Sequence, residues 1–258
     1  MSDEELEIID LNLENIDTEH ICCAIGNDKK NKERAKLKKA WLKERFPEGH
    51  TFKKFNVRGK VFIEYVRAEY AWFPIVAPGY MFIQCFWASG RYKGQGLGAK
   101  LLAECEKDSK DKNGLVAITS NKKRPFMVDK KYYLGKGFEV CDFANPFFEL
   151  VVKKYKKGAP SPYFTEKAKQ AKMPGKTGLT FLYSDLCPHT ADWVDEMIGV
   201  AGTYDLPCEK IKIEGLKEAK DLPVPWGIFS LFYNGKFLTY EVMTDKKFDK
   251  LLSGVVKS

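Results

Sequence analysis

The chain has 258 residues, 44% of them hydrophobic and 14% aromatic, so it can bury one large or two ordinary cores and is not a disordered protein. Seven scattered cysteines without a C-x-x-C pair, and three histidines far apart, argue against a disulfide framework or a metal site. The acidic N-terminus and the lack of an eighteen-residue apolar run predict neither a signal peptide nor a membrane span, and we expect a cytoplasmic protein. A net charge of +8 is spread over several lysine clusters without a recognisable binding motif, so nucleic-acid binding is not expected.

The first eighty residues predict a sheet with one early helix. The expected strands are residues 7–13, 51–57 and 60–66, and the expected helix is residues 29–46. Arg58-Gly59 has the composition of a hairpin turn between the second and third strands. The aromatic segment 70–80 contains Pro74 and Pro78, which deny it a regular central strand, so it either lines a pocket or covers the sheet.

The stretch 81–120 predicts a strand, a glycine-rich turn, a helix and a second strand. Residues 81–88 are mostly apolar, and apolar residues recur at helical spacing from Leu97 to Cys105. The glycines at positions 94, 96 and 98 alternate, so successive backbone N–H groups can point into one concavity at a helix N-terminus. Such a nest suits an anion, most naturally a pyrophosphate. Neither the Walker pattern nor the G-x-G-x-x-G dinucleotide fingerprint fits this spacing.

This turn resembles the acetyl-CoA loop of the GNAT superfamily of N-acetyltransferases, [RQ]-x-x-G-x-[GA]. The loop residues are Lys93, Gly94, Gln95, Gly96, Leu97, Gly98 and Ala99. Lys93 stands where Arg or Gln is usual, which keeps the positive charge but loses a planar donor. The resemblance implies that the loop holds the pyrophosphate of acetyl-CoA, and the strand at 115–119 fits the family order. The alternative is a glycine-rich surface turn ahead of an ordinary helix.

A second motif lies at residues 129–139, which read DKKYYLGKGFE and resemble the family signature F-Y-x-x-x-G-F. Tyr133 lies five positions before Phe138 and matches the tyrosine that in many members protonates the departing CoA thiolate. A phenol beside the sulfur can donate a proton or a hydrogen bond to the anion that forms there. The alternative is that Tyr132 and Tyr133 are core aromatics that close a helix on a strand.

The resemblance implies further roles along the strand 81–88 and after the strand 115–119. Backbone groups of Phe86, Trp87 and Ala88 would contact the thioester oxygen and the pantetheine arm of the coenzyme. Asn121 stands where members often place a side chain against that arm.

The resemblance also implies a base near the acceptor amine, which must lose a proton before it can attack. In this family a glutamate on a central strand commonly accepts that proton, often through water. Glu64 is the candidate, with Glu69 a weaker one. Glu64 shares a face with Phe62 and Val66, which fits a buried carboxylate, whereas an exposed edge charge is the alternative. The helix 29–46 would border the acceptor site.

The last third of the chain predicts a separate, smaller domain. Residues 153–175 are rich in lysine and contain three prolines, and they predict a linker with one short helix at 165–172. The expected strands that follow are residues 179–183, 208–213, 228–233 and 237–242, and the expected helices are residues 191–201 and 246–252. This order resembles a thioredoxin-like fold.

Cys187 falls where that fold places its attacking cysteine, at a helix N-terminus whose dipole stabilises a thiolate. Thr190 occupies the position of the resolving cysteine, so no disulfide can form within the motif. Pro225 lies two residues further from the Asn-Gly turn than the usual cis-proline. A working monothiol and a redox-silent scaffold are the two interpretations.

Together these patterns predict an α/β protein in three parts: a GNAT domain (1–155) with a mixed, mostly antiparallel sheet flanked by helices, a linker (156–176) and a thioredoxin-like domain (177–258). The arrangement resembles the YoaP-type architecture. The predicted function is acetyl-CoA-dependent transfer of an acetyl group to a small-molecule or peptide amine, by direct attack in a ternary complex. The alternatives are a CoA-binding regulatory or sensor protein without turnover and a monothiol redox protein that uses Cys187. The sequence leaves the amine and the oligomeric state open.

Overall fold

The structure is a computed structural model that describes residues 6–256, and its chain forms two compact units. The first unit contains the residues up to Ala71, Ile75–Phe143 and Phe147–Phe164. The second contains Trp72–Pro74, Ala144–Pro146 and the residues from Thr165 onward. The segment 156–176, expected as a linker, contains the strand β9 (Tyr163–Phe164) and the helix α4 (Glu166–Gln170).

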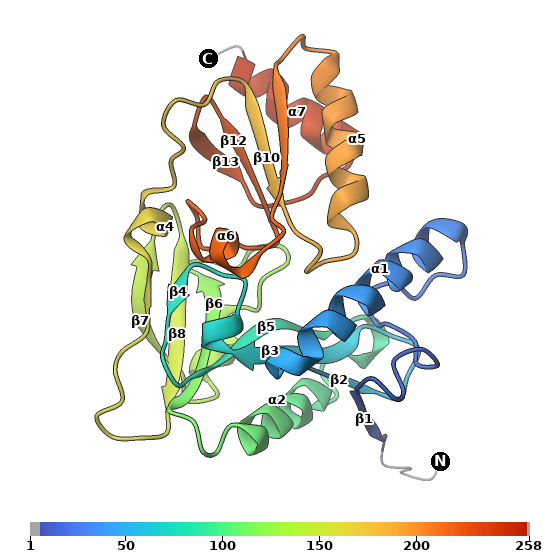
Figure 1. The fold of residues 1–258 in the computed structure, drawn as a ribbon, viewed down its shortest axis with the longest axis vertical. Helices are drawn as coiled ribbons and strands as arrows, with labels where there is room; N and C mark the ends of the chain where they lie inside the picture. The colour runs from blue at the N-terminus through green and yellow to red at the C-terminus, as the bar shows by residue number, and fades with distance from the viewer. Residues whose placement is uncertain (1–5, 257–258) are drawn as a thin grey trace. The chain divides into compact units, whose positions relative to one another are not determined.

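The first unit is built on a seven-stranded sheet with the order β1-β2-β3-β5-β6-β8-β7 (Figure 1). Its strands are β1 (Ile8–Leu11), β2 (Thr51–Phe55), β3 (Val61–Arg67), β5 (Met81–Ala88), β6 (Gly114–Ser120), β7 (Glu139–Ala144) and β8 (Phe148–Lys154). β5 and β6 are parallel, whereas β1-β2, β2-β3, β3-β5 and β6-β8 are antiparallel. The predicted mixed, mostly antiparallel sheet is therefore confirmed. The strand β4 (Ile75–Val76) lies outside this sheet and pairs with β9.

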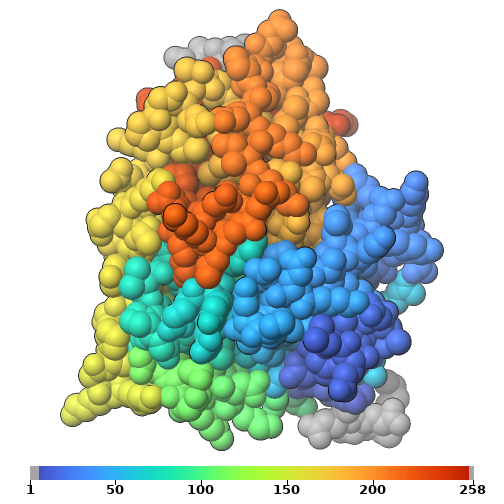
Figure 2. All heavy atoms as spheres, viewed as in Figure 1, coloured from blue at the N-terminus to red at the C-terminus, as the bar shows by residue number. Residues whose placement is uncertain are grey.

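Helices cover both faces of this sheet. They are α1 (Lys29–Arg45), α2 (Leu97–Asp108) and the short α3 (Lys130–Leu134), together with 3-10 turns at Phe46–Glu48, Ala68–Tyr70 and Gly90–Tyr92. Because side chains alternate along a strand, Ile63 and Tyr65 of β3 face the α2 side, whereas Glu64 faces α1 and contacts Lys38. Asp28 is the N-cap of α1, and its carboxylate accepts a hydrogen bond from the backbone N–H of Asn31. The lysine-rich α1 lies at the surface of this unit (Figure 2).

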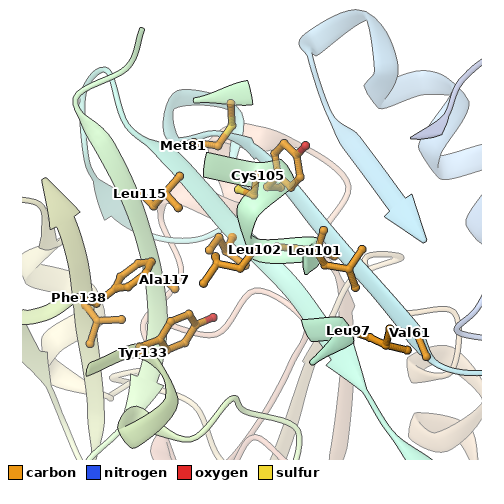
Figure 3. Packing of buried hydrophobic residues seen from close by; sticks show 14 of the residues in the cluster. Val61, Met81, Leu97, Leu101, Leu102, Cys105, Leu115, Ala117, Tyr133 and Phe138 are labelled. Atoms are coloured by element: carbon orange, nitrogen blue, oxygen red, sulfur yellow. The ribbon is translucent and has the colours of Figure 1, made fainter. Parts of the chain in front are cut away.

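One hydrophobic core of the first unit lies between α2 and the sheet (Figure 3). The helix buries the residues that its predicted spacing placed on one face: Leu97, Leu101, Leu102 and Cys105. These side chains pack against residues of β3, β5 and β6, among them Ile63, Ile83 and Ala117. Burying one such large aliphatic side chain contributes on the order of 1.5–3 kcal/mol, so this face fixes where the N-terminus of α2 lies.

The second unit has a four-stranded sheet with the order β11-β10-β12-β13. Its elements are β10 (Leu179–Tyr183), α5 (Thr190–Gly202), β11 (Cys208–Lys212), α6 (Leu216–Lys220), β12 (Phe229–Tyr233), β13 (Lys236–Thr239) and α7 (Asp245–Val256). β10 is parallel to β11 and antiparallel to β12, and β12 is antiparallel to β13. Asn234 and Gly235 both have positive φ, 47° and 72°, as the predicted two-residue hairpin turn requires. The predicted order of strands, hairpin and closing helix is confirmed.

The sequence reasoning missed the strands β4, β7 and β9 and the helix α6. It placed the aromatic segment 70–80 as a pocket lining or a sheet cover. In the structure Phe73 of this segment belongs to the second unit, where its ring meets that of Trp226 at 6.0 Å. Among residues 6–256, no helix combines the length and the apolar character that crossing a membrane requires.

Candidate active site

The two parallel strands of the first unit separate part-way along the sheet. Their pairing runs from Met81 opposite Leu115 to Ile83 opposite Ala117. The next residue, Gln84, is the extra residue of a β-bulge, because Glu64 pairs with Cys85 and Tyr65 with Ile83. Beyond the bulge β5 continues beside β3 while β6 continues beside β8.

The separation leaves one side of β5 open to a ligand. Residues 81–84 are buried, but Cys85, Phe86, Trp87 and Ala88 are only half-buried. Backbone N–H and C=O groups on such an edge can bond an extended chain as another strand would. The structure therefore places the three residues predicted for the thioester and the pantetheine arm on an accessible edge.

The glycine-rich loop follows this edge directly. Gly94 and Gly96 have φ of 81° and 77°, the left-handed region that only glycine adopts freely. Lys93, Gln95 and both glycines are exposed. Gly96 is the N-cap of α2 and provides no side-chain hydrogen bond, so N–H groups of the first helical turn remain available to an anion. Leu97, by contrast, is buried in the core and anchors the loop.

Gly98 lies at the meeting point of the loop, β5 and α3. A Cβ added to Gly98 would lie 3.5 Å from Cζ of Phe86, 3.6 Å from the hydroxyl of Tyr132 and 3.8 Å from Cβ of Ala88. The ring of Tyr132 meets that of Phe86 edge-on, with 5.6 Å between centroids. The motif-derived residues of the strand and of the loop are thus brought together, with Tyr132 between them.

Tyr133, the predicted acid, lies in the hydrophobic core and is 2% exposed. Its ring packs on Phe138 with 5.0 Å between centroids, and both residues are labelled in Figure 3. Burial raises the pKa of the Tyr133 phenol far above its usual value, with further contributions from Tyr132, Cys105 and Cys85. The phenol therefore stays protonated and acts as a donor at every working pH. Cys85, the first residue beyond the bulge, is close enough to influence this hydroxyl.

Glu64, the predicted base, is 1% exposed and is held in a buried polar cluster. Its Oε1 accepts hydrogen bonds from Lys38 Nζ at 2.6 Å, His50 Nε2 at 2.8 Å and Gln84 Nε2 at 3.2 Å. Trp41 closes the cluster, because the Lys38 ammonium lies 4.3 Å from the centre of its ring. We refer to Lys38, His50, Glu64 and Gln84 as the Glu64 cluster.

The charges in the Glu64 cluster follow from burial and from the ion pair. Burial, the largest single influence, raises the pKa of Glu64, but the Lys38 ammonium and the hydrogen bond from His50 outweigh it and hold this pKa below its usual value. Burial also lowers the pKa of His50, so the imidazole is neutral at pH 7. An ionised carboxylate with a lowered pKa is a poor proton acceptor, and the Glu64 geometry suits positioning of the bulge better than proton removal. The role of Glu64 as base stays a prediction.

Two other predicted residues lie at turns. Asn121 is exposed just after β6, and its backbone N–H donates to the carbonyl of Phe147 at 3.1 Å. Glu69, the weaker candidate base, accepts a hydrogen bond from the backbone N–H of Gly79 at 2.7 Å. This hydrogen bond stabilises the turn that precedes β5.

The sequence reasoning missed Lys38, His50 and Gln84 and treated Tyr132 only as a core aromatic. Lys38 is one of many lysines of α1, and no local pattern separates it from its exposed neighbours. The signal for Tyr132 was its place beside Tyr133 in the second motif. The signal for Gln84 was its polar side chain within the otherwise apolar strand 81–88.

Cys187 lies in the second unit, half-buried in the turn before α5. Thr190, at the resolving position, donates through its hydroxyl to the carbonyls of Ser184 and Cys187, both at 2.8 Å. This threonine is therefore a structural residue of the turn. Within residues 6–256, no disulfide joins the seven cysteines, and no group of three or more potential ligands is placed to hold a metal ion.

Comparison with known proteins identifies the class to which this fold and this site belong. The acetyltransferase (GNAT) family model matches residues 14–125, and the YoaP-like model matches residues 207–250. The chain belongs to the GNAT acetyltransferases that carry a C-terminal YoaP-like domain, and it is an acyltransferase. Over 247 residues it is 36% identical to a Bacillus subtilis (strain 168) protein described as an uncharacterized N-acetyltransferase, YoaP, a match that covers 95% of this chain and 98% of that protein.

Solved structures resemble part of the chain at lower identity. The chain is 19% identical to the PaiA N-acetyltransferase of Thermoplasma acidophilum in complex with coenzyme A, with a TM-score of 0.40 over 58% of this chain and 99% of that one. It is 15% identical to a GNAT acetyltransferase of Brucella melitensis in complex with acetyl-CoA, with a TM-score of 0.37 over 61% and 92%.

Proposed function

We propose that this protein transfers the acetyl group of acetyl-CoA to the nitrogen of an amine by direct attack in a ternary complex. Membership of the acetyltransferase family supports the chemistry and the donor. The observation that carries the proposal is the opening of β5 from β6 after Ile83, directly ahead of the glycine loop that begins α2. An open strand edge followed by a helix N-terminus suits an extended chain that ends in a pyrophosphate.

In the proposed arrangement the loop from Lys93 to Ala99 binds the pyrophosphate and the edge from Phe86 to Ala88 binds the pantetheine arm. The exposed Lys93 adds positive charge to the N–H groups of the α2 N-terminus. Asn121, just beyond β6, would contact the arm from the other side of the opening.

The reaction forms one bond and breaks one. The lone pair of the neutral amine attacks the thioester carbon, the C–N bond forms, the C–S bond breaks, and the thiolate leaves with the electron pair of the C–S bond. Tyr133 donates a proton or a hydrogen bond to this thiolate. The proton lost by the amine passes to a base, for which Glu64 is the prediction, or to solvent.

Two measurements on the purified full chain test the proposal. Calorimetry with coenzyme A should show binding, and loss of the thioester absorbance of acetyl-CoA should depend on an added amine. A panel of a peptide N-terminus, lysine, polyamines and aminoglycosides would identify the acceptor. Binding without turnover over the whole panel would favour the sensor alternative, whereas the absence of coenzyme binding would overturn the proposal.

A further inference from the structure

The hydroxyl of Tyr132 is a buried polar atom without a hydrogen-bond partner in the structure. Burial raises the pKa of Tyr132 to about 12, so the hydroxyl keeps its proton and is a donor. A buried donor that is left unpaired costs on the order of 1–3 kcal/mol, so each such group needs an explanation from its surroundings. The position of this hydroxyl indicates what it binds.

The hydroxyl lies where the coenzyme-binding elements converge. It is 3.6 Å from the place that a Cβ of Gly98 would occupy, and Phe86 and Ala88 bound the same space. Gly98 lies in the first turn of α2, next to the loop proposed for the pyrophosphate, while Phe86 and Ala88 form the edge proposed for the pantetheine arm. The space therefore belongs to the junction between the two parts of the coenzyme.

The two adjacent tyrosines have different surroundings. Tyr133 is buried in the hydrophobic core, with its ring packed on Phe138. Tyr132 lies instead against Phe86, Ala88 and Gly98, further along β5 toward the loop. Successive residues of a helix differ by about 100° in direction, so the two side chains leave α3 in different directions.

We propose that Tyr132 is a coenzyme-binding residue whose hydroxyl donates a hydrogen bond to an oxygen of acetyl-CoA where the pyrophosphate meets the pantetheine arm. Gly98 lacks a side chain, and this leaves the space in which that oxygen lies. The inference rests on the proposed function, because it needs coenzyme in this groove. It assigns Tyr132 to binding and leaves the thiolate to Tyr133.

Calorimetry with coenzyme A and the full-length chain tests this assignment with two variants and a matched control. Tyr132→Phe should raise the Kd for coenzyme A about five- to twentyfold, as loss of one hydrogen bond does. Tyr155→Phe is the control, because the Tyr155 hydroxyl is also buried and unpaired. Tyr155 lies near Cys105 and Glu106, which are about 12 Å further along α2 than Gly98. This control should leave the Kd within about twofold of wild type.

Gly98→Ala tests the space in front of the hydroxyl. The new Cβ would make ordinary contacts of 3.5 to 3.8 Å, and alanine favours a helix over glycine, so thermal unfolding should not shift to lower temperature. The same methyl group would crowd the gap between Gly98 and the Tyr132 hydroxyl in which the coenzyme oxygen is proposed to lie, so the Kd should rise at least about tenfold.

The outcomes separate this inference from the function on which it rests. If wild type binds coenzyme A and Tyr132→Phe binds it equally well, the Tyr132 assignment is wrong while the proposed function stands. If Gly98→Ala binds coenzyme A as tightly as wild type, the coenzyme oxygen does not lie in the space beside Gly98, and the Tyr132 assignment is again wrong. If wild type fails to bind coenzyme A, the proposed function itself is wrong. In turnover, Tyr132→Phe should raise the KM for acetyl-CoA and leave kcat nearly unchanged, which a general loss of structure would not do.

Discussion

Replacing Lys38 with methionine would leave the carboxylate of Glu64 buried without its ammonium partner. The Lys38 side chain is fully buried and that of Glu64 is 2% exposed, and the two charged atoms are 2.6 Å apart. Methionine has nearly the same length as the lysine stem, so the substitution removes the charge and keeps most of the packing. We expect the charge, and not a cavity, to dominate the effect.

Removing one partner of a buried ion pair typically costs about 3–5 kcal/mol of the free energy of unfolding. Glu64 keeps its hydrogen bonds from His50 and Gln84, so the lower end of this range, about 3 kcal/mol, is the expected loss at pH 7. Denaturant unfolding followed by far-UV circular dichroism measures this loss, provided that the m-value does not change.

The pH dependence distinguishes a lost charge from lost packing. In wild type the lowered pKa of Glu64 gives a stabilising contribution that is present above the unfolded-state pKa, about 4.3, and lost as the pH falls through the folded-state value. Without Lys38, burial dominates and the pKa of Glu64 should rise above its unfolded value. The pKa of His50 should rise with it, because Lys38 lowers it in wild type. The folded variant would then bind more protons than the unfolded chain, and its stability should increase as the pH falls from neutral toward the unfolded-state pKa of glutamate.

Lys43→Met on the same helix is the matched control. Lys43 pairs with Asp17 at 2.7 Å, but both side chains are well exposed, so we expect no resolvable change in stability. A loss for Lys38→Met no greater than for this control, or a loss with the same pH dependence as wild type, would show that the buried charge of Glu64 does not need Lys38. The double variant Lys38→Met/Glu64→Gln should recover most of the stability, because both charges are then absent.

The remaining predictions concern the two reactive side chains. Tyr133→Phe should lower kcat about 10- to 100-fold while coenzyme A binds as in wild type, because only the donor to the leaving thiolate is lost; thioester loss and calorimetry measure the two effects, and an unchanged kcat would remove the acid assignment. Cys187→Ser should retain full acetyl transfer, because the proposed reaction uses no thiol of the protein. Rapid alkylation of Cys187 in wild type at neutral pH, measured by mass spectrometry, would instead support the monothiol alternative.

Most of the fold could be predicted from the sequence, because the elements of the core carry strong patterns. The strand at 81–88 and the buried face of α2 were predicted from an apolar run and from helical spacing, and both are present. β7 was missed because Glu139, Val140 and Phe143 are all exposed, so this edge strand lacks the alternation of a half-buried one. α6 has only five residues, too few for a periodic pattern.

The site was predictable where a motif fixes the backbone and not where it depends on contacts between distant residues. Alternating glycines indicated the loop because positive φ leaves a mark in the sequence, and Gly94 and Gly96 have it. Lys38, the partner of Glu64, lies 26 residues earlier in a helix of mostly exposed lysines, so no sequence pattern indicates that Lys38 is buried. The difference between Tyr132 and Tyr133 is one of direction, which requires the structure.

The Glu64 cluster connects the stability of the sheet to the geometry of the proposed site. Gln84 is the bulge residue, and its side chain donates to Glu64, so the cluster fixes the point at which β5 leaves β6. A loss of activity in Glu64→Gln alone would therefore fit both a lost base and a displaced strand, because the Lys38 charge would also be left unpaired. The double variant Lys38→Met/Glu64→Gln separates the two. If Glu64 positions the bulge, acetyl transfer should return together with stability, and a stable double variant without turnover would instead identify Glu64 as the base.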